Sequence, residues 1–298
     1  MARFIVQQCP VCGGNSFSEE FQCTDHFVSG EIFPVKKCAS CGLRITENDK
    51  KKKNIGRYYQ SEEYISHSNT TKGLVNKVYH VVRKFMLGQK RRLIEKTARK
   101  SPGHILDLGA GTGFFLNEMK RHGWQVDGTE KSAEARKFAD SAFGLPLSEP
   151  EELFQRKKES ADVITLWHVL EHIHKMDENM KAIHNVLKTE GHLIIAVPNP
   201  ESTDARHYRE YWAAWDVPRH LWHFGPDQMK KLGRKFGFRL LAMKPMPFDA
   251  FYVSLLSEKY KKSNFPFLKG IFYGKISWLS SLIQTRKCSS VIYVFKKE

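Results

Sequence analysis

The chain has 298 residues, 41% hydrophobic and 27% charged, which is enough for one sizeable core and a small accessory module. No apolar run approaches the roughly 18 to 20 residues of a membrane-spanning helix, and the N-terminal residues lack the apolar core of a signal peptide. These features exclude integral membrane and secreted classes and predict a cytoplasmic protein. Lys and Arg exceed Asp and Glu by 48 to 32, so the net charge of +16 favours an anionic partner.

The first chemical motif is a pair of C-x-x-C sequences, each followed by glycine: Cys9-Pro-Val-Cys12 and Cys38-Ala-Ser-Cys41. In a cytosolic chain this pattern is typical of a metal site, and two such turns complete a tetrahedral, structural zinc site. We predict a zinc-knuckle domain over residues 1–46 that depends on its metal, because so short a segment buries little surface. The alternative is a redox dithiol, which would need only one such pair, at a helix start.

Residues 47–100 are predicted to form a linker and a basic helical segment. From Lys72 to Lys100 there are ten basic residues and one acid, Glu95. Such clustering favours binding of a phosphate group, but a solvated helix face explains it equally well.

The middle of the chain predicts a nucleoside-binding half-fold. A short apolar strand at 104–108 leads into Gly109-Ala-Gly-Thr-Gly113 and then a helix from Phe114. A second strand ends at Glu130, 17 residues after Gly113, where a βαβ unit places an acid for ribose hydroxyls. The glycines let the backbone approach a ligand at the helix N-terminus.

Helices are predicted over 170–188 and 226–236. Together with the two strands, these helices predict an α/β fold.

The loop sequence Asp107-x-Gly109-x-Gly111-x-Gly113 resembles motif I of class I S-adenosylmethionine-dependent methyltransferases, and the resemblance spans roughly residues 101–239. It differs from the dinucleotide fingerprint G-x-G-x-x-G. The resemblance implies a Rossmann-like seven-stranded sheet with helices on both faces, occupying residues 101–298. The further strands of this sheet would lie at 161–168, 191–198, 238–244 and 290–295.

The resemblance also implies the cofactor site. Asp107, Gly109, Ala110, Gly111 and Gly113 would line the methionine end of S-adenosylmethionine, and Glu130 would bind the ribose. Trp167 and His168 would face the sulfonium and the acceptor, and Tyr58 and Tyr59 would lie in the cofactor pocket. For these last four residues, a packing role in the core or lid is the alternative.

The segment Leu166-Trp-His-Val-Leu-Glu-His172 resembles the small-molecule branch, which includes quinone-biosynthesis O-methyltransferases. Some of those enzymes hold magnesium with acids and a histidine in this stretch. Here His168 stands where they have a glutamate, so the sequence argues against magnesium.

The aromatic segment 211–224 is expected to roof the acceptor site. It is similar to a loop of zinc-domain sugar C-methyltransferases, whose catalytic histidine would correspond to His220. Arg219 replaces their glutamate, which favours transfer to oxygen with His220 as general base and His168 orienting the acceptor. A structural role in the lid is the alternative for His220.

Residues 249–286 form an insertion with an apolar face, for which we predict a helical cap. Peripheral contact with a membrane surface is the weaker interpretation.

The sequence therefore predicts methyl transfer from S-adenosylmethionine to a small-molecule, glycan or lipid-linked acceptor at a hydroxyl. An RNA methyltransferase using the basic surface and zinc module is an alternative. Nucleic acid is disfavoured as a substrate because the Asn/Asp-Pro-Pro-Tyr/Phe turn of base-amine methyltransferases is missing after the strand at 161–168. A binding protein that has lost catalysis is the other alternative.

Overall fold

The computed structural model describes residues 4–48, 58, 74–98, 102–246 and 248–298. The chain forms two compact units that interleave in sequence. The first comprises Met1–Gln60, His168–Asp177 and Ile195–Val294, and the second comprises Ser61–Trp167, Glu178–Ile194 and Phe295–Glu298. The proposed domain boundaries at residues 46 and 100 remain a prediction.

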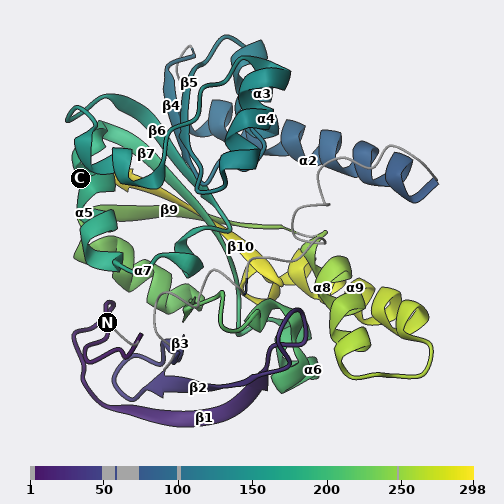
Figure 1. Cartoon of the computed structure of the whole chain (residues 1–298). Coiled ribbons are helices and arrows are strands. Elements are labelled where there is room, and N and C mark those ends of the chain that lie inside the picture. Colours follow the sequence, from purple (N-terminus) through teal and green to yellow (C-terminus); the bar gives the residue numbers. More distant parts are fainter. Residues whose placement is uncertain (1–3, 49–57, 59–73, 99–101, 247) are drawn as a thin grey trace. The chain divides into compact units, whose positions relative to one another are not determined.

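The predicted α/β sheet is confirmed, with the strand order β5-β4-β6-β7-β10-β9 (Figure 1). Its strands are β4 (His104–Leu108), β5 (Gln125–Thr129), β6 (Ala161–Trp167), β7 (Leu187–Pro198), β9 (Phe238–Pro245) and β10 (Ser290–Lys297). Strand β4 pairs in parallel with both β5 and β6. Its apolar residues Ile105 and Leu106 are fully buried, as expected for a strand covered on both faces.

This sheet contains six strands among the described residues, whereas we predicted seven. Outside the six strands, an isolated parallel bridge joins Thr129, at the end of β5, to Ser148. The segment then turns into the short 3-10 helix η2 (Pro150–Gln155). Proline cannot donate a ladder hydrogen bond, and Pro150 comes two residues after the bridge.

The second unit carries the helices α2 (Leu74–Ala98), α3 (Phe114–Arg121) and α4 (Ala133–Phe143). Helix α4 begins where the Ser132 hydroxyl accepts a hydrogen bond from the Ala135 amide, and it ends at Gly144 in the left-handed conformation. The single helix predicted over 170–188 is instead the 3-10 turn η3 (Leu170–His172) followed by α5 (Met176–Val186).

The first unit contains a four-stranded sheet of order β1-β2-β3-β8. Its strands are β1 (Phe17–Thr24), β2 (Ile32–Cys38), β3 (Arg44–Thr46) and β8 (Trp222–His223). Antiparallel pairing of Arg44 with His223 and of Ile45 with Trp222 joins the cysteine-bearing segment to the end of the aromatic loop. The N-terminal segment therefore folds together with residues almost 180 positions later.

The remaining elements of the first unit are helical. They are α6 (Thr203–Tyr208), η4 (Arg209–Tyr211), η5 (Ala213–Trp215), α7 (Pro226–Lys235), α8 (Asp249–Tyr260), α9 (Pro266–Ile283) and η6 (Thr285–Lys287). The insertion 249–286 is helical as predicted, with α8 and α9 packed side by side (Figure 1). No described helix is both long and apolar enough to cross a membrane.

An aromatic core holds the first unit together. It combines Cys23, Phe33 and Val35 of the N-terminal sheet with Tyr208, Trp212 and Trp215 of the later helical segments, and Tyr58 lies among them with no exposed surface. Burial of such large side chains is the main stabilising contribution available to this short sheet.

Candidate functional site

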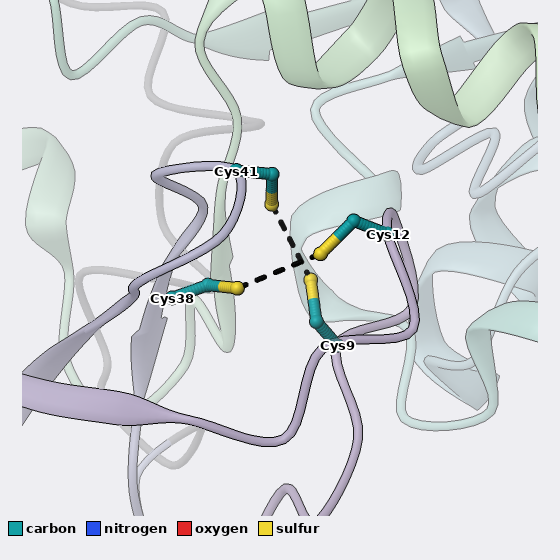
Figure 2. Close-up of side chains that lie close together, drawn as sticks. All are labelled: Cys9, Cys12, Cys38 and Cys41. Carbon is teal, nitrogen blue, oxygen red and sulfur yellow. Dashed lines mark hydrogen bonds between the residues drawn. The ribbon is translucent and has the colours of Figure 1, made fainter.

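Four cysteines converge on one point in the N-terminal segment (Figure 2). The Cys9 and Cys41 sulfurs lie 3.5 Å apart, and the Cys12 and Cys38 sulfurs lie 3.6 Å apart. Zinc–sulfur bonds of about 2.3 Å in a tetrahedron place sulfurs about 3.8 Å apart, so the arrangement fits a tetrahedral zinc ion. All six cysteines are free thiols, and Cys23 and Cys288 are buried elsewhere.

Each C-x-x-C pair sits in a tight turn closed by a backbone hydrogen bond. The Gly13 amide donates to the Cys9 carbonyl and the Gly42 amide to the Cys38 carbonyl, and both glycines have positive φ. The Gly14 amide also points at the Cys12 sulfur, 3.4 Å away. Amides directed at the sulfurs stabilise thiolates, which is the ligand form that zinc requires.

The glycine loop of the second unit has the geometry of a ligand cradle. Gly111 has φ of +54°, and a Cβ added there would meet no atom within 4 Å. The amides of Gly109 and Ala110 both donate to the Thr129 carbonyl, which fixes the loop against the end of β5. Gly113 has a positive φ as well, and a Cβ there would lie only 3.0 Å from Ala139 on α4. The loop is thus packed on one side and open at Gly111.

Glu130 holds this loop through the Gly111 amide, whereas Asp107, which precedes the loop, bonds to Thr165 of β6. One oxygen of the Glu130 carboxylate accepts the Gly111 amide and the other accepts the Ser132 amide, each at 2.8 Å. Asp107 is buried, accepts the Thr165 hydroxyl at 2.5 Å, and has its pKa raised to about 7 chiefly by burial. Each carboxylate oxygen of Glu130 keeps a further lone pair, so the group can still accept a hydroxyl.

The other predicted cofactor residues have mixed surroundings. The Trp167 ring lies under the Lys90 ammonium at 4.2 Å, and its buried indole N–H has no hydrogen-bond partner in the described part of the chain. The fully buried Tyr58 packs against Phe33, and its hydroxyl donates to Glu31 at 2.6 Å. Tyr58 therefore has the packing role in this structure, because neither its ring nor its hydroxyl is accessible. Tyr59 lies outside the described residues.

His168 follows β6 with φ of +60° and contacts two carboxylates. Its Nδ1 lies 3.4 Å from Glu171 and its Nε2 lies 3.1 Å from Asp249. Enclosure alone would lower the pKa of His168, but the two carboxylates outweigh it and raise the pKa to about 10. His168 is therefore an imidazolium at neutral pH with both nitrogens engaged. Asp249 was missed in the sequence, since only the fold brings it 81 residues back to His168.

Two further histidines approach Glu171. Their rings pack edge to face at 4.6 Å, and both use Nδ1–H to donate at 2.9 Å to a carbonyl, His172 to Arg219 and His220 to Ala214. Each Nε2 therefore carries a lone pair. One ring nitrogen from each histidine and one Glu171 oxygen lie within 4.8 Å of one another. Burial and the neighbouring His220 lower the pKa of His172 to about 4.

Glu171 itself is an unusual buried acid. It is 1% exposed, and neither carboxylate oxygen accepts a hydrogen bond from any described residue. Burial would raise its pKa, but the surrounding histidines, His168 foremost, hold that pKa below its ordinary value. In the sequence, Glu171 stands out only because some quinone-biosynthesis O-methyltransferases bind magnesium through acids in this stretch.

These residues do not fit magnesium. Glu171, His172 and His220 offer one oxygen and two nitrogens, whereas magnesium prefers oxygen ligands in near-octahedral geometry. His168, which stands where the magnesium-binding enzymes have a glutamate, is already paired with Glu171 and Asp249. The types of donor atom at this site therefore support the sequence-based argument against magnesium.

The tryptophans of the aromatic loop are buried in the first unit, and the role of this loop as a roof of the acceptor site stays a prediction. Trp212, Trp215 and Trp222 are buried, and their indole N–H groups donate to Asp204, the Arg209 carbonyl and the Ile173 carbonyl. Apolar rings with satisfied donors pack inward, which the sequence pattern alone does not distinguish from a lid.

Arg219 explains how this loop is held. Its guanidinium is 1% exposed and binds Asp25 at 2.9 Å and Asp216 at 2.6 Å. It also donates to the Tyr58 carbonyl at 3.1 Å. Burial would lower the pKa of Arg219, but the two carboxylates raise it, so the group stays charged. The residue before His220 is therefore an anchor to the N-terminal segment.

Comparison with known proteins identifies the chain. The methyltransferase domain family matches residues 82–243, more than half of the chain. The ubiquinone biosynthesis O-methyltransferase of Cupriavidus pinatubonensis is 25% identical over 164 residues, covering 49% of this chain and 64% of that protein. The chain thus spans less than two thirds of that relative's length.

Two solved structures have the same fold. A SAM dependent methyltransferase from Archaeoglobus fulgidus is 18% identical with a TM-score of 0.50, covering 72% of this chain and 94% of that one. The [4+2]-cyclase SpnF is 16% identical with a TM-score of 0.50, covering 70% of this chain and 80% of that one. Identities this low show only the fold. With the family match over residues 82–243, the chain belongs to the methyltransferase domain family and has the class I S-adenosylmethionine-dependent methyltransferase fold.

Proposed function

We propose that the protein transfers a methyl group from S-adenosylmethionine to a hydroxyl oxygen of a small-molecule or lipid-linked acceptor. The observation that carries the oxygen assignment is the tautomer of His220. Because its Nδ1–H donates to the Ala214 carbonyl, its Nε2 can accept a proton. The O-methyltransferase relative supports the same acceptor chemistry.

The cofactor would be held by the glycine loop of the second unit. Bound S-adenosylmethionine supplies an electrophilic methyl group. The open space at Gly111 gives room for close approach of the backbone, and Glu130 has lone pairs left for ribose hydroxyls. The indole N–H of Trp167, at the end of β6, bonds to no described residue and could donate to the cofactor.

Proton removal would fall to His220. Its Nε2 would take the hydroxyl proton as the oxygen–methyl bond forms and the sulfur–methyl bond breaks. S-adenosylhomocysteine would leave as the neutral thioether, and His220 would become an imidazolium. Glu171 lies 3.4 Å from the His168 Nδ1 and accepts no hydrogen bond from a described residue, and Asp216 lies 3.8 Å from the His220 Nε2. These two carboxylates would stabilise that imidazolium. His168 is already protonated and held by Asp249, so it would orient Glu171 rather than accept a proton.

The four cysteines would hold one structural zinc ion. Four thiolate ligands leave no open coordination position for a substrate, and this supports a role in folding rather than in the reaction.

The general base is tested by His220→Ala. Methyl transfer from labelled S-adenosylmethionine to hydroxylated aromatic acceptors should fall about 10²- to 10⁴-fold, the usual contribution of a positioned base. Calorimetric affinity for S-adenosylmethionine should stay unchanged. His122→Ala, which removes the histidine that follows α3 and bonds the Glu118 carbonyl, is the matched control and should keep full activity.

Loss of less than tenfold in His220→Ala would assign the residue to packing and leave positioning as the source of the rate. Equal loss of cofactor affinity would show a damaged fold instead of a missing base.

A further inference from the structure

Helix α9 buries its small residues and exposes its large apolar ones, which is the reverse of a typical helix on a protein surface. Its buried residues are the small ones, Gly270, Gly274, Ser277 and Ser281. Eight of its large apolar residues are exposed, from 38% at Ile276 to 87% at Ile283. We define the apolar face of α9 by six of them: Phe267, Leu268, Phe272, Leu279, Leu282 and Ile283.

Close packing explains the small residues. A Cβ at Gly270 would lie 2.8 Å from the Leu255 backbone, and a Cβ at Gly274 would lie 2.9 Å from the Phe251 backbone. Helix α8 therefore contacts the small face of α9 at short range, and no described residue buries the large apolar side chains on the other side. Exposure of a contiguous apolar face is costly in water, and such faces mark interaction sites.

The chain segment that carries this face is basic. Between Lys259 and Lys287 there are seven basic residues and no acid. Six are exposed lysines, of which Lys269 and Lys275 lie on α9 and Lys261 and Lys262 lie in the turn before it. Lysine stems can lie along apolar surface while the ammonium groups reach outward to negative charge.

We propose that the apolar face of α9 inserts into the surface of an anionic phospholipid bilayer. Large aliphatic and aromatic side chains would enter the boundary between headgroups and acyl chains, and the lysines would contact lipid phosphates. Charge complementarity favours this occupant over a second copy of the chain, because two such faces would bring their lysines together. A helix with these features lies in the interface and does not span it.

The inference stands apart from the proposed methyl transfer, although it suits a lipid-linked acceptor. It is tested on the full chain by flotation with vesicles of phosphatidylcholine, with and without phosphatidylglycerol. The protein should float with the anionic vesicles and stay below with the neutral ones, and added salt should weaken binding.

The triple variant Phe267→Gln, Phe272→Gln and Leu282→Gln should lower partition into anionic vesicles by at least about tenfold. The matched control replaces three apolar residues exposed elsewhere, Ile32→Gln, Phe154→Gln and Leu241→Gln, and should bind as the wild type does. Both variants should keep their affinity for S-adenosylmethionine, so failure here is distinct from failure of the cofactor site.

Unchanged flotation of the α9 variant would overturn the proposal. Vesicle binding would then come from general attraction between the basic protein and the anionic lipid. A wild type that sediments as a dimer without binding vesicles, and an α9 variant that is monomeric, would instead make the face an interface between two copies.

Discussion

His168 forms ion pairs with two carboxylates that come from different segments of the first unit. Asp249 begins α8 and Glu171 lies in η3, and the two carboxylates hold the imidazolium between them. The folded protein prefers the protonated form of His168, since its pKa is raised to about 10. The resulting stabilisation is complete below the ordinary histidine pKa of 6.5 and is lost as the pH rises from 6.5 through 10.

Asp249→Asn should therefore lower the free energy of unfolding at pH 7 by about 1 kcal/mol, a value reduced for the partial exposure of this pair. The difference from wild type should shrink as the pH approaches 10, because His168 then loses its proton in both proteins. Imidazole NMR should show the pKa of His168 falling toward its ordinary value.

The control is Asp177→Asn, which removes an acid from an exposed ion pair with Lys235 and should change stability little at any pH. Titration of wild-type His168 near 6.5 would contradict the assigned pairing.

The strand–loop–helix element from β4 to α3 depends on backbone conformation more than on side chains. Gly111 is the position where the left-handed conformation and open space coincide. An L side chain there is strained, and its Cβ would occupy space into which a cofactor must fit. The effect of a substitution on folding can therefore be separated from its effect on binding.

Gly111→Ala should lower stability by about 1–2 kcal/mol through backbone strain and lower S-adenosylmethionine affinity at least about tenfold. Gly30→Ala is a close control, since Gly30 has φ of +69° and equally open surroundings but lies in a turn of the N-terminal sheet. It should show the same loss of stability in thermal unfolding with no loss of affinity in calorimetry. Equal affinities of the two variants would remove Gly111 from the cofactor site.

At the scale of the whole molecule, the cysteine-bearing segment and the His220 loop belong to one compact unit. The β3–β8 pairing and the Arg219–Asp25 contact join them, and the glycine loop belongs to the other unit. Loss of the metal should therefore also destabilise the fold of residues 216–223, while the cofactor loop should stay folded.

Purified protein should contain about one zinc per chain, and Cys38→Ser or a strong chelator should release it. Hydrogen exchange should then increase in the N-terminal sheet and in residues 216–223, because both lose their common support. Methyl transfer should fall sharply while S-adenosylmethionine still binds. Protection of residues 216–223 in the metal-free protein would show that the loop is held without the zinc domain.

The sequence determined the local features of this protein. Glycine spacing, apolar runs and paired cysteines identified the sheet, the ligand loop and the four-cysteine cluster, because each depends on neighbours within a few residues. The strands at 161–168, 238–244 and 290–295 are found within one or two residues of the predicted positions.

Only the tertiary structure decided which distant residues meet. Arg219 appeared in the sequence as the replacement of a catalytic acid, and the fold makes it a buried anchor to Asp25. Asp249 and Glu171 close on His168, and the tryptophans of the aromatic loop are buried. Contacts between residues tens to nearly two hundred positions apart leave no periodic signal in the chain, since they arise from how packed elements exclude water.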